Sequence, residues 1–469
     1  MKKLIFLFTL LFAAGLNAGA QQQKLEEILQ EYGVSGVQLD YAKNGIEKTY
    51  VAGVIRDDSN HPVDEQTVYH AASLSKSVSA YVFFRLYDRG LIGLDVPLVK
   101  YTGSYSKFVD PRINRITARM VLSHRTGLPN WGDDNGFKMN FSPDSTFSYS
   151  GEGFDFLQAA MEKITGKPLN ELADEEVFGP LGMRSSSYIW EERFARYVGF
   201  IVMPNDHRYI NREPNAAYSL LTTAHDYTLF LQALLAGKGL KPATAKMIFE
   251  KASADPSYNM HKSEFDSHIA WGLGVGLQYN EKGKAAWHWG DGYGGDYKCF
   301  YIAYPATKES LVFFTHSDKG LDMTPDIVNL FLGKQTTWAI KWLSYGYQYP
   351  EAMKKFKKQL LAHGYTEAIT IAEKDKRKDA AFRLSENDLN GFGYELLGQG
   401  KKDAALEIFK LSVKLFPESP NTYDSLGETY QAMGQKEQAI SNYKKVLEFN
   451  PKSTNAVKHL QQLDPNFKP

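Results

Sequence analysis

The chain has 469 residues, more than one hydrophobic core usually supports, so we expect two or three domains. Hydrophobic residues make up 43% of the sequence and aromatic residues 13%, enough to fill such cores. Lys plus Arg and Asp plus Glu both total 54, so no net charge draws the protein to nucleic acid or to an anionic membrane.

The first 20 residues have the pattern of a secretory signal peptide. Two lysines and the apolar run 4–14 precede the small residues 18–20, which form a cleavage site before Gln21. The apolar run is shorter than the roughly 20 residues that a membrane-spanning helix needs. The sequence therefore predicts a protein of the bacterial periplasm or the outside medium with no stable membrane anchor.

The next segments predict an antiparallel sheet interrupted by helices. Residues 36–55 contain two alternating runs separated by Asn44 and Gly45, a strong hairpin signal. Helical and loop patterns occupy residues 73–251. Strand patterns return in WGLGVGLQY, KCFYIAYP and SLVFFTHS, and they place Cys299, the single cysteine, in a buried strand. We expect a first domain over 21–333 whose two ends build one sheet.

The C-terminal part is rich in Lys, Glu, Gln, Leu and Ala and predicts helices only. Six of its positions recur after 34 residues, the tetratricopeptide period. The pairs are Phe392 and Leu426, Gly393 and Gly427, Leu396 and Tyr430, Ala405 and Ala439, Phe409 and Tyr443, and Pro417 and Pro451. We predict a helical linker region over 334–385 whose helices pack on the first repeat, two repeats over 386–455, and a C-terminal helix or tail over 456–469. We expect the repeats to serve as a groove for a protein partner, as a stabilising cap or shield for the first domain, or as a dimer contact.

Ser73 and Lys76 are the first candidates for chemistry. A spacing of three puts both side chains on one helix face, and the helix N-terminus adds positive potential. The same spacing of Ser and Lys recurs at Ser104 and at Ser441, and serine also favours helix starts. The pattern by itself is therefore compatible with a nucleophile or with an ordinary helix start.

Longer segments of the sequence favour the interpretation of Ser73 as a nucleophile. Between about Gly33 and Lys319 the sequence resembles the serine β-lactamase and penicillin-binding protein superfamily, in the branch related to class C β-lactamases that includes esterases and D-alanyl-D-alanine peptidases. The segments that carry the resemblance are, in chain order, HAASLSKS, ITARMVLSHRTGLPNW, FSYSGEGFDFLQAAMEKITGKPLNELADEEVFGPLGMRSSSY, NAAYSLLTTAHDY, WGLGVGL and WHWGDGYGG. The resemblance implies an α+β fold, a β-lactamase-like antiparallel sheet flanked by a helical insertion, ahead of the all-α repeat region.

The resemblance also implies catalytic roles. Ser73 matches the acylated serine of the family, Lys76 its partner, and Tyr149 of the sequence Tyr-Ser-Gly the tyrosine that shares the proton of the serine with the lysine. Because tyrosine has an ordinary pKa near 10, it needs a neighbouring cation to act as a base. Tyr149 beside a charged Lys76, and a neutral Lys76, both remain possible bases.

A second group of residues would bind the substrate. His288 and Gly290 match a motif of Lys or His, any residue, and Gly on a strand that lines the site of the family. The backbone N–H groups of Ser73 and Asp291 would then form the oxyanion hole. His124, which follows a helical run and precedes a turn, is expected to hold that turn.

One position departs from the family. The second motif commonly ends in an Asn whose amide holds the acylamide of β-lactams and peptides, and Gly151 stands there. We expect Glu152 to occupy part of the vacated space and to bind Lys76 or a substrate amine. The departure favours an esterase or a less selective peptidase over a β-lactamase.

These observations predict an exported serine hydrolase that forms an acyl-enzyme on Ser73 from small esters or amides, with D-amino-acid peptides of the cell wall among the candidates. The alternatives are a β-lactamase or D-alanyl-D-alanine carboxypeptidase proper, and a catalytically weak ligand-binding protein with a partner site on its repeats. Water would resolve the acyl-enzyme, so no metal or organic cofactor is expected. The sequence contains no HExxH zinc motif and no phosphate-binding loop.

Overall fold

A computed structural model of the protein describes residues 19–55, 60–105, 110–132, 138–194, 212–253, 267–292, 297–345, 350–398, 400–464 and 466–467. The chain divides into two compact units, Met1–Tyr347 and Gln348–Pro469. Of the predicted signal peptide, residues 1–18 lie outside the described ranges, and residues 19 and 20 belong to a helix that covers 19–32. Every helix within the described ranges is too short or too polar to cross a lipid bilayer.

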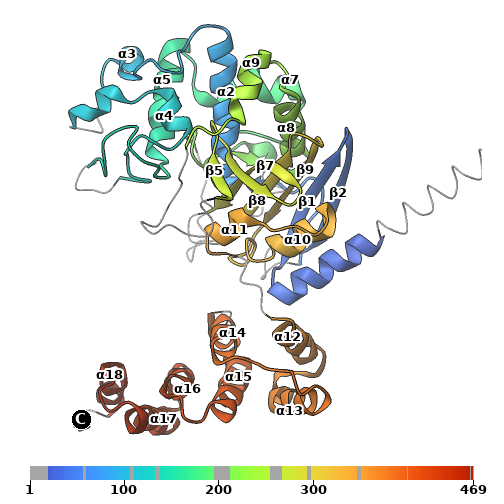
Figure 1. Cartoon of the computed structure of the whole chain (residues 1–469), viewed down its shortest axis with the longest axis vertical. Coiled ribbons are helices and arrows are strands. Elements are labelled where there is room, and N and C mark those ends of the chain that lie inside the picture. The colour runs from blue at the N-terminus through green and yellow to red at the C-terminus, as the bar shows by residue number, and fades with distance from the viewer. Residues whose placement is uncertain are drawn as a thin grey trace, which may run out of the picture. The chain divides into compact units, whose positions relative to one another are not determined.

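The first unit is built on a seven-stranded antiparallel sheet of order β2-β1-β9-β8-β7-β6-β5 (Figure 1). The strands are β1 (Gly36–Lys43), β2 (Ile46–Gly53), β5 (Ile269–Trp271), β6 (Gly276–Asn280), β7 (Gly283–Asp291), β8 (Lys298–Tyr304) and β9 (Glu309–Thr315). Val37 of β1 lies opposite Thr315 of β9. The prediction that both ends of the domain build one sheet is therefore confirmed.

The turn between β1 and β2 follows from its two residues. Asn44 and Gly45 have φ angles of +52° and +77°. Positive φ at both central positions matches the right-handed twist of the two strands, and Asn followed by Gly accepts it at the lowest steric cost. The predicted hairpin is confirmed.

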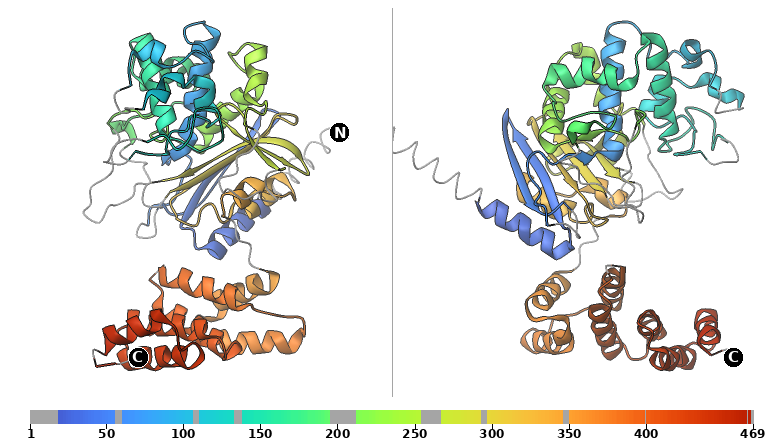
Figure 2. Two further views of the ribbon diagram at one scale, coloured as in Figure 1. Left: turned by 60° about the vertical axis from the view of Figure 1, so that its left-hand side comes forward. Right: turned by 180° about the vertical axis from the view of Figure 1, so that it is seen from behind.

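A helical insertion between β2 and β5 covers one face of the sheet, and the helix over 19–32 lies with α10 (Thr324–Leu332) and α11 (Trp338–Trp342) on the other face (Figure 2). The insertion holds α2 (Ser75–Asp88), α3 (Val99–Thr102), α4 (Ala118–Leu122), α5 (Glu152–Thr165), α6 (Leu169–Ala173), α7 (Gly179–Leu181), α8 (Ala224–Ala236), α9 (Pro242–Ile248), and the short strands β3 (Tyr69–His70) and β4 (Leu221–Thr222). Val78, Val82 and Leu86 of α2 are fully buried. A helix buried on nearly all sides forms the centre of a core, so α2 is a rigid base for residues at its start.

The first unit extends beyond the boundary that the sequence predicts at Gly333. Ala339 and Ile340 of α11 are fully buried, in the same core as Trp271 and Trp287 of the sheet. Residues 334–345 therefore pack with the sheet rather than with the predicted linker.

The second unit consists of α12 (Glu351–His363), α13 (Ala368–Lys378), α14 (Glu386–Gly398), α15 (Lys402–Leu415), α16 (Pro420–Ala432), α17 (Lys436–Phe449) and α18 (Thr454–Leu463). In each predicted repeat a glycine faces an aromatic ring, Gly393 against Phe409 and Gly427 against Tyr443. A β-carbon at position 393 would lie 2.4 Å from the Phe409 ring. The predicted pairing of small and aromatic residues is confirmed.

Candidate active site

Ser73 lies in a tight turn between β3 and α2. The turn is a 3-10 segment over Ala72–Leu74, and Ala72 has a φ of +42°. A positive φ is uncommon for a residue with a side chain and persists only where the surrounding fold enforces it. The residue that caps α2 is Leu74, so the Ser73 hydroxyl is not the cap of this helix.

Lys76 extends its ammonium group back to the serine. Its Nζ donates to Oγ of Ser73 at 3.1 Å and to the carbonyl oxygen of Ala217 at 2.9 Å. The side chain is completely buried, and burial lowers the pKa of Lys76 to about 7, while the charge of Asp155 acts in the opposite direction. A lysine that gains and loses its proton near neutral pH beside a hydroxyl has the property of a general base.

Tyr149 reaches the same point from the segment before α5. The Nζ atom of Lys76 lies 4.8 Å from the centroid of the Tyr149 ring. The ring packs against His124 and Trp289, with centroid distances of 4.3 and 4.6 Å. The structure thus brings together the three residues to which the resemblance assigns catalysis.

His124 holds the segment that carries Tyr149. It has a φ of +54°, its carbonyl oxygen accepts from the N–H of Ser148 at 2.8 Å, and its Nδ1 accepts from the N–H of Ser150 at 3.1 Å. Burial lowers the pKa of His124 well below its usual value, and the nearby charge of Lys76 adds to the effect. His124 is therefore a neutral side chain that fixes a turn, in line with the turn-holding role expected from the sequence.

Strand β7 brings His288, Gly290 and Asp291 to the serine turn. A β-carbon at Gly290 would lie 2.8 Å from the carbonyl oxygen of Ala71 and 2.2 Å from Sγ of Cys299. Only glycine therefore lets β7 approach the turn this closely. Asp291 has a carboxylate that accepts from Tyr345 Oη at 2.8 Å and pairs with Lys298, while the oxyanion role of its backbone N–H stays a prediction.

The imidazole side chain of His288 on β7 is buried and neutral. Its Nδ1 lies 2.8 Å from the carbonyl oxygen of Trp289, which can only accept, so the proton is on Nδ1. Burial lowers the pKa of His288 to about 3, and the charge of Lys76 acts in the same direction. Its Nε2 has no hydrogen-bond partner within the part of the chain that the structure describes. The atom is buried, so the substrate-binding role of His288 stays a prediction.

The space beside Gly151 is filled by the ring of Trp131, while the expected contact of Glu152 with Lys76 or a substrate amine stays a prediction. A β-carbon at position 151 would lie 2.5 Å from Cη2 of Trp131. The Glu152 carboxylate accepts from the backbone N–H of Gly132 at 3.3 Å, next to the tryptophan. Glu152 thus supports the segment that presents the indole ring.

The Trp131 indole is also exposed beside Lys76. It is 45% exposed, it meets Tyr218 edge to face at 5.6 Å between centroids, and its ring centroid lies 5.8 Å from Lys76 Nζ. A large exposed aromatic surface in a candidate site is suited to contact with an apolar group of a ligand. Both residues lie in segments that carry the family resemblance, but the sequence gave neither of them a role, because an isolated aromatic residue in a loop has no periodic pattern.

Asp155 and Gln158 are functional candidates that sequence reasoning missed. Asp155 accepts from Asn215 Nδ2 at 2.8 Å, and Gln158 accepts from the N–H of Ala216 at 2.7 Å. These two side chains of α5 fix the loop whose Ala217 carbonyl oxygen accepts from Lys76. The same helix also carries Glu152, Glu162 and Lys163, so the polarity of these two residues gave no specific signal in the sequence.

Comparisons with known proteins agree with this geometry. Residues 22–333 match the protein family described as Beta-lactamase, and residues 420–453 match the family described as Tetratricopeptide repeat. A solved structure titled "A class C beta-lactamase" superimposes with a TM-score of 0.57 at 16% identity, over 67% of this chain and 95% of that one. The fold that the resemblance implies, an α+β β-lactamase-like sheet with helical repeats, is thereby confirmed.

Two curated relatives are enzymes. "Esterase EstB" of Burkholderia gladioli is 26% identical over 220 residues, 39% of this chain and 56% of that protein. "D-alanyl-D-alanine-carboxypeptidase/endopeptidase AmpH" of Escherichia coli (strain K12) is 26% identical over 156 residues, 29% of this chain and 40% of that protein. The matched stretches thus span about half the length of these relatives.

Proposed function

Because the chain belongs to the β-lactamase family of serine hydrolases, we propose that it hydrolyses small esters or amides through an acyl-enzyme on Ser73. The observation that carries the proposal is the buried Lys76, whose Nζ contacts Ser73 Oγ at 3.1 Å and whose pKa falls to about 7. A lysine of ordinary pKa would be protonated at neutral pH and could not accept the hydroxyl proton.

The first half of the reaction follows from these positions. Neutral Lys76 takes the proton of Ser73 as Oγ forms a bond to the substrate carbonyl carbon. The N–H groups of Ser73 and Asp291 stabilise the oxyanion. Lys76 and Tyr149 return the proton to the leaving alcohol or amine as its bond to the carbonyl carbon breaks. Water then attacks the ester on Ser73 with the same groups as base and acid, which releases the carboxylic acid and the free hydroxyl.

The surroundings of position 151 favour esters with an apolar acyl group. The amide donor that holds an acylamide in the family is absent at Gly151, and Trp131 takes its place. A site without that donor loses the hydrogen bond that β-lactams and D-amino-acid peptides use, whereas an exposed indole offers contact to a hydrocarbon or aromatic chain. Cell-wall peptides and β-lactams are therefore secondary candidates.

Export and a protein partner complete the proposal. Lys2 and Lys3 followed by an apolar run support export into the periplasm or medium. The match of residues 420–453 to the tetratricopeptide family supports a partner-binding role for the second unit. Deletion of the second unit with retention of ester turnover and loss of a co-purifying protein would support that role, whereas loss of turnover would contradict it.

The test is intact-protein mass spectrometry after brief exposure to a fluorophosphonate, a p-nitrophenyl ester or a penicillin. We expect adducts on the wild-type protein and none on Ser73→Ala. Ser441→Ala is the matched control, because Ser441 has the same spacing to a lysine but lies exposed on α17 of the second unit. Labelling that persists in Ser73→Ala, or no labelling of the folded wild type, would contradict the proposal.

A further inference from the structure

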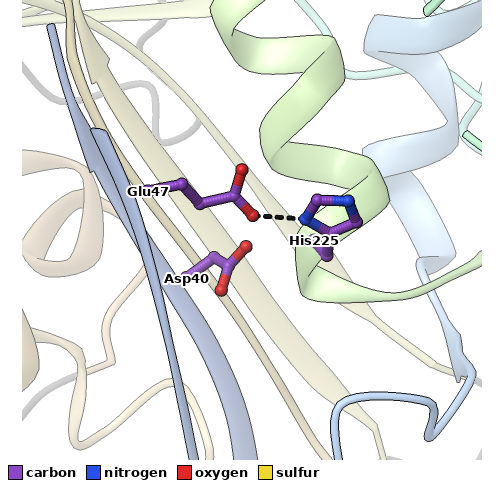
Figure 3. Close-up of side chains that lie close together, drawn as sticks. All are labelled: Asp40, Glu47 and His225. Atoms are coloured by element: carbon purple, nitrogen blue, oxygen red, sulfur yellow. Dashed lines mark hydrogen bonds and ion pairs between the residues drawn. The ribbon is translucent and has the colours of Figure 1, made fainter. Parts of the chain in front are cut away.

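Three side chains from separate elements meet on the face of the sheet that α8 covers. Asp40 comes from β1, Glu47 from β2 and His225 from the first turn of α8. Their donor atoms all lie within 4.8 Å of one another. Figure 3 shows both carboxyl groups on the hairpin facing the imidazole ring on the helix.

Asp40 is the member that marks this cluster as a binding site. It is fully buried, and neither of its carboxylate oxygens has a hydrogen-bond partner within the described residues. Buried carboxylates are ordinarily paired with a cation or bound to a metal. Asp40 has no hydrogen-bond partner among the described residues, so it is an exception to this rule.

The other two members are accessible to solvent. The side chains of Glu47 and His225 are 25% and 52% exposed, and they contact each other through Oε1 and Nδ1. An ion can therefore enter from solvent past these two groups. Tetrahedral zinc holds N and O ligands at about 2.0–2.2 Å, so the side chains must close around it by small rotations, for which the exposed Glu47 and His225 have room.

We propose that Asp40, Glu47 and His225 bind a first-row divalent cation of the zinc type. An imidazole with two carboxylates suits Zn²⁺, whereas Ca²⁺ and Mg²⁺ prefer all-oxygen ligand sets. Water would complete the coordination. The two negative charges of the carboxylates balance the ion, and the ion supplies the cation that Asp40 lacks.

The ion would fasten the β1–β2 hairpin to the start of α8. That helix supports the serine turn, because Oη of Tyr227 donates to the carbonyl oxygen of Leu74 at 3.0 Å. The role is structural, since the three ligands are distinct from the residues around Ser73 that the hydrolysis uses. No sequence motif predicts the site, because its ligands come from separate segments.

The test is isothermal titration calorimetry of the full chain, after treatment with a chelator, with ZnCl₂ as the probe. We expect one Zn²⁺ per chain and a rise in the thermal unfolding midpoint on Zn²⁺ addition. His225→Ala should weaken binding at least tenfold and remove the rise, and Asp40→Asn should do the same. His363→Ala is the control, an exposed histidine at the end of α12.

Ester turnover separates this proposal from the proposed function. His225→Ala should keep the ester turnover of the wild type while it loses Zn²⁺. Absence of stoichiometric Zn²⁺ binding by the wild type, or binding equally tight in His225→Ala and Asp40→Asn, would overturn the site. Tighter binding of Ca²⁺ than of Zn²⁺ would overturn the assigned class of ion.

Discussion

The indole ring of Trp131 fills the space that a side chain at position 151 would occupy. A β-carbon there would lie between 2.5 and 2.9 Å from three atoms of the ring. The glycine and the tryptophan therefore depend on each other, and neither substitution is neutral by itself.

Substitution of both residues tests this dependence. Gly151→Asn should destabilise the protein by about 1–3 kcal/mol through overpacking, and Trp131→Ala in the same chain should relieve most of that cost. Urea unfolding of the four proteins in a double-mutant cycle measures the coupling. Gly153→Ala is the control, because its nearest neighbour would lie 3.4 Å away. Additive free energies of unfolding would contradict the contact.

Ester kinetics test the role of the indole ring. Trp131→Ala should raise KM for an aromatic p-nitrophenyl ester by about tenfold, the equivalent of about 1.4 kcal/mol, and change the turnover of the acetate ester much less. Gly151→Asn should alter the ratio of penicillin to ester turnover, because it restores an amide donor. If Gly151→Asn leaves both turnovers unaltered, the argument from position 151 is wrong.

The pH dependence of hydrolysis should follow Lys76. In the proposed mechanism the neutral amine of Lys76 is the base, so kcat/KM should rise as the pH increases through about 7, the pKa of this buried lysine. Asp155→Asn removes the charge that raises this pKa, so the rise should move to lower pH. Glu162→Gln on the same helix is the control and should leave the profile in place. A profile that does not respond to Asp155→Asn would assign the titration to another group.

Burial of Lys76 should also lower the free energy of unfolding at neutral pH. Its pKa in the folded protein is about 7, against 10.5 for an ordinary lysine. As the pH falls from 10.5 to 7, the unfolded chain binds a proton that the folded protein does not bind. The resulting loss in the free energy of unfolding is therefore absent at high pH and complete below pH 7. Lys76→Met should therefore stabilise the protein by on the order of a few kcal/mol at pH 7 and by much less at pH 10. Chemical denaturation at both pH values measures the difference, and an equal effect at both would contradict it.

The glycines of α14 offer a test of the repeat packing. Gly393→Ala would place a methyl group 2.4 Å from the Phe409 ring, whereas nothing lies within 4 Å of such a group at Gly398. Alanine is otherwise the better helix former by about 1 kcal/mol. Hydrogen exchange of the full chain should become faster in α14 and α15 for Gly393→Ala and unchanged or slower for Gly398→Ala. The reverse order would refute the close helix contact.

Local patterns were the part of this fold that the sequence predicted well. Asn44 and Gly45 determine their turn by their own backbone preferences, and the spacing of Ser73 and Lys76 places them on one helical turn. The contact of Trp131 with Gly151 and the link from Asp155 to Asn215 join segments that are remote in sequence, so no short pattern contains them. The side chain that fills the space beside Gly151 comes from another loop, so the sequence could not predict it.

The pairing of Val37 with Thr315 also bears on how the chain folds. Strand β1 reaches its neighbour β9 only after the whole helical insertion has been synthesised. Contacts between remote segments slow folding, because the entropy of a large loop must be lost before the strands pair. During synthesis the edge of β1 that later pairs with β9 therefore stays unpaired. Any truncation before β9 leaves this edge exposed to pairing with other chains.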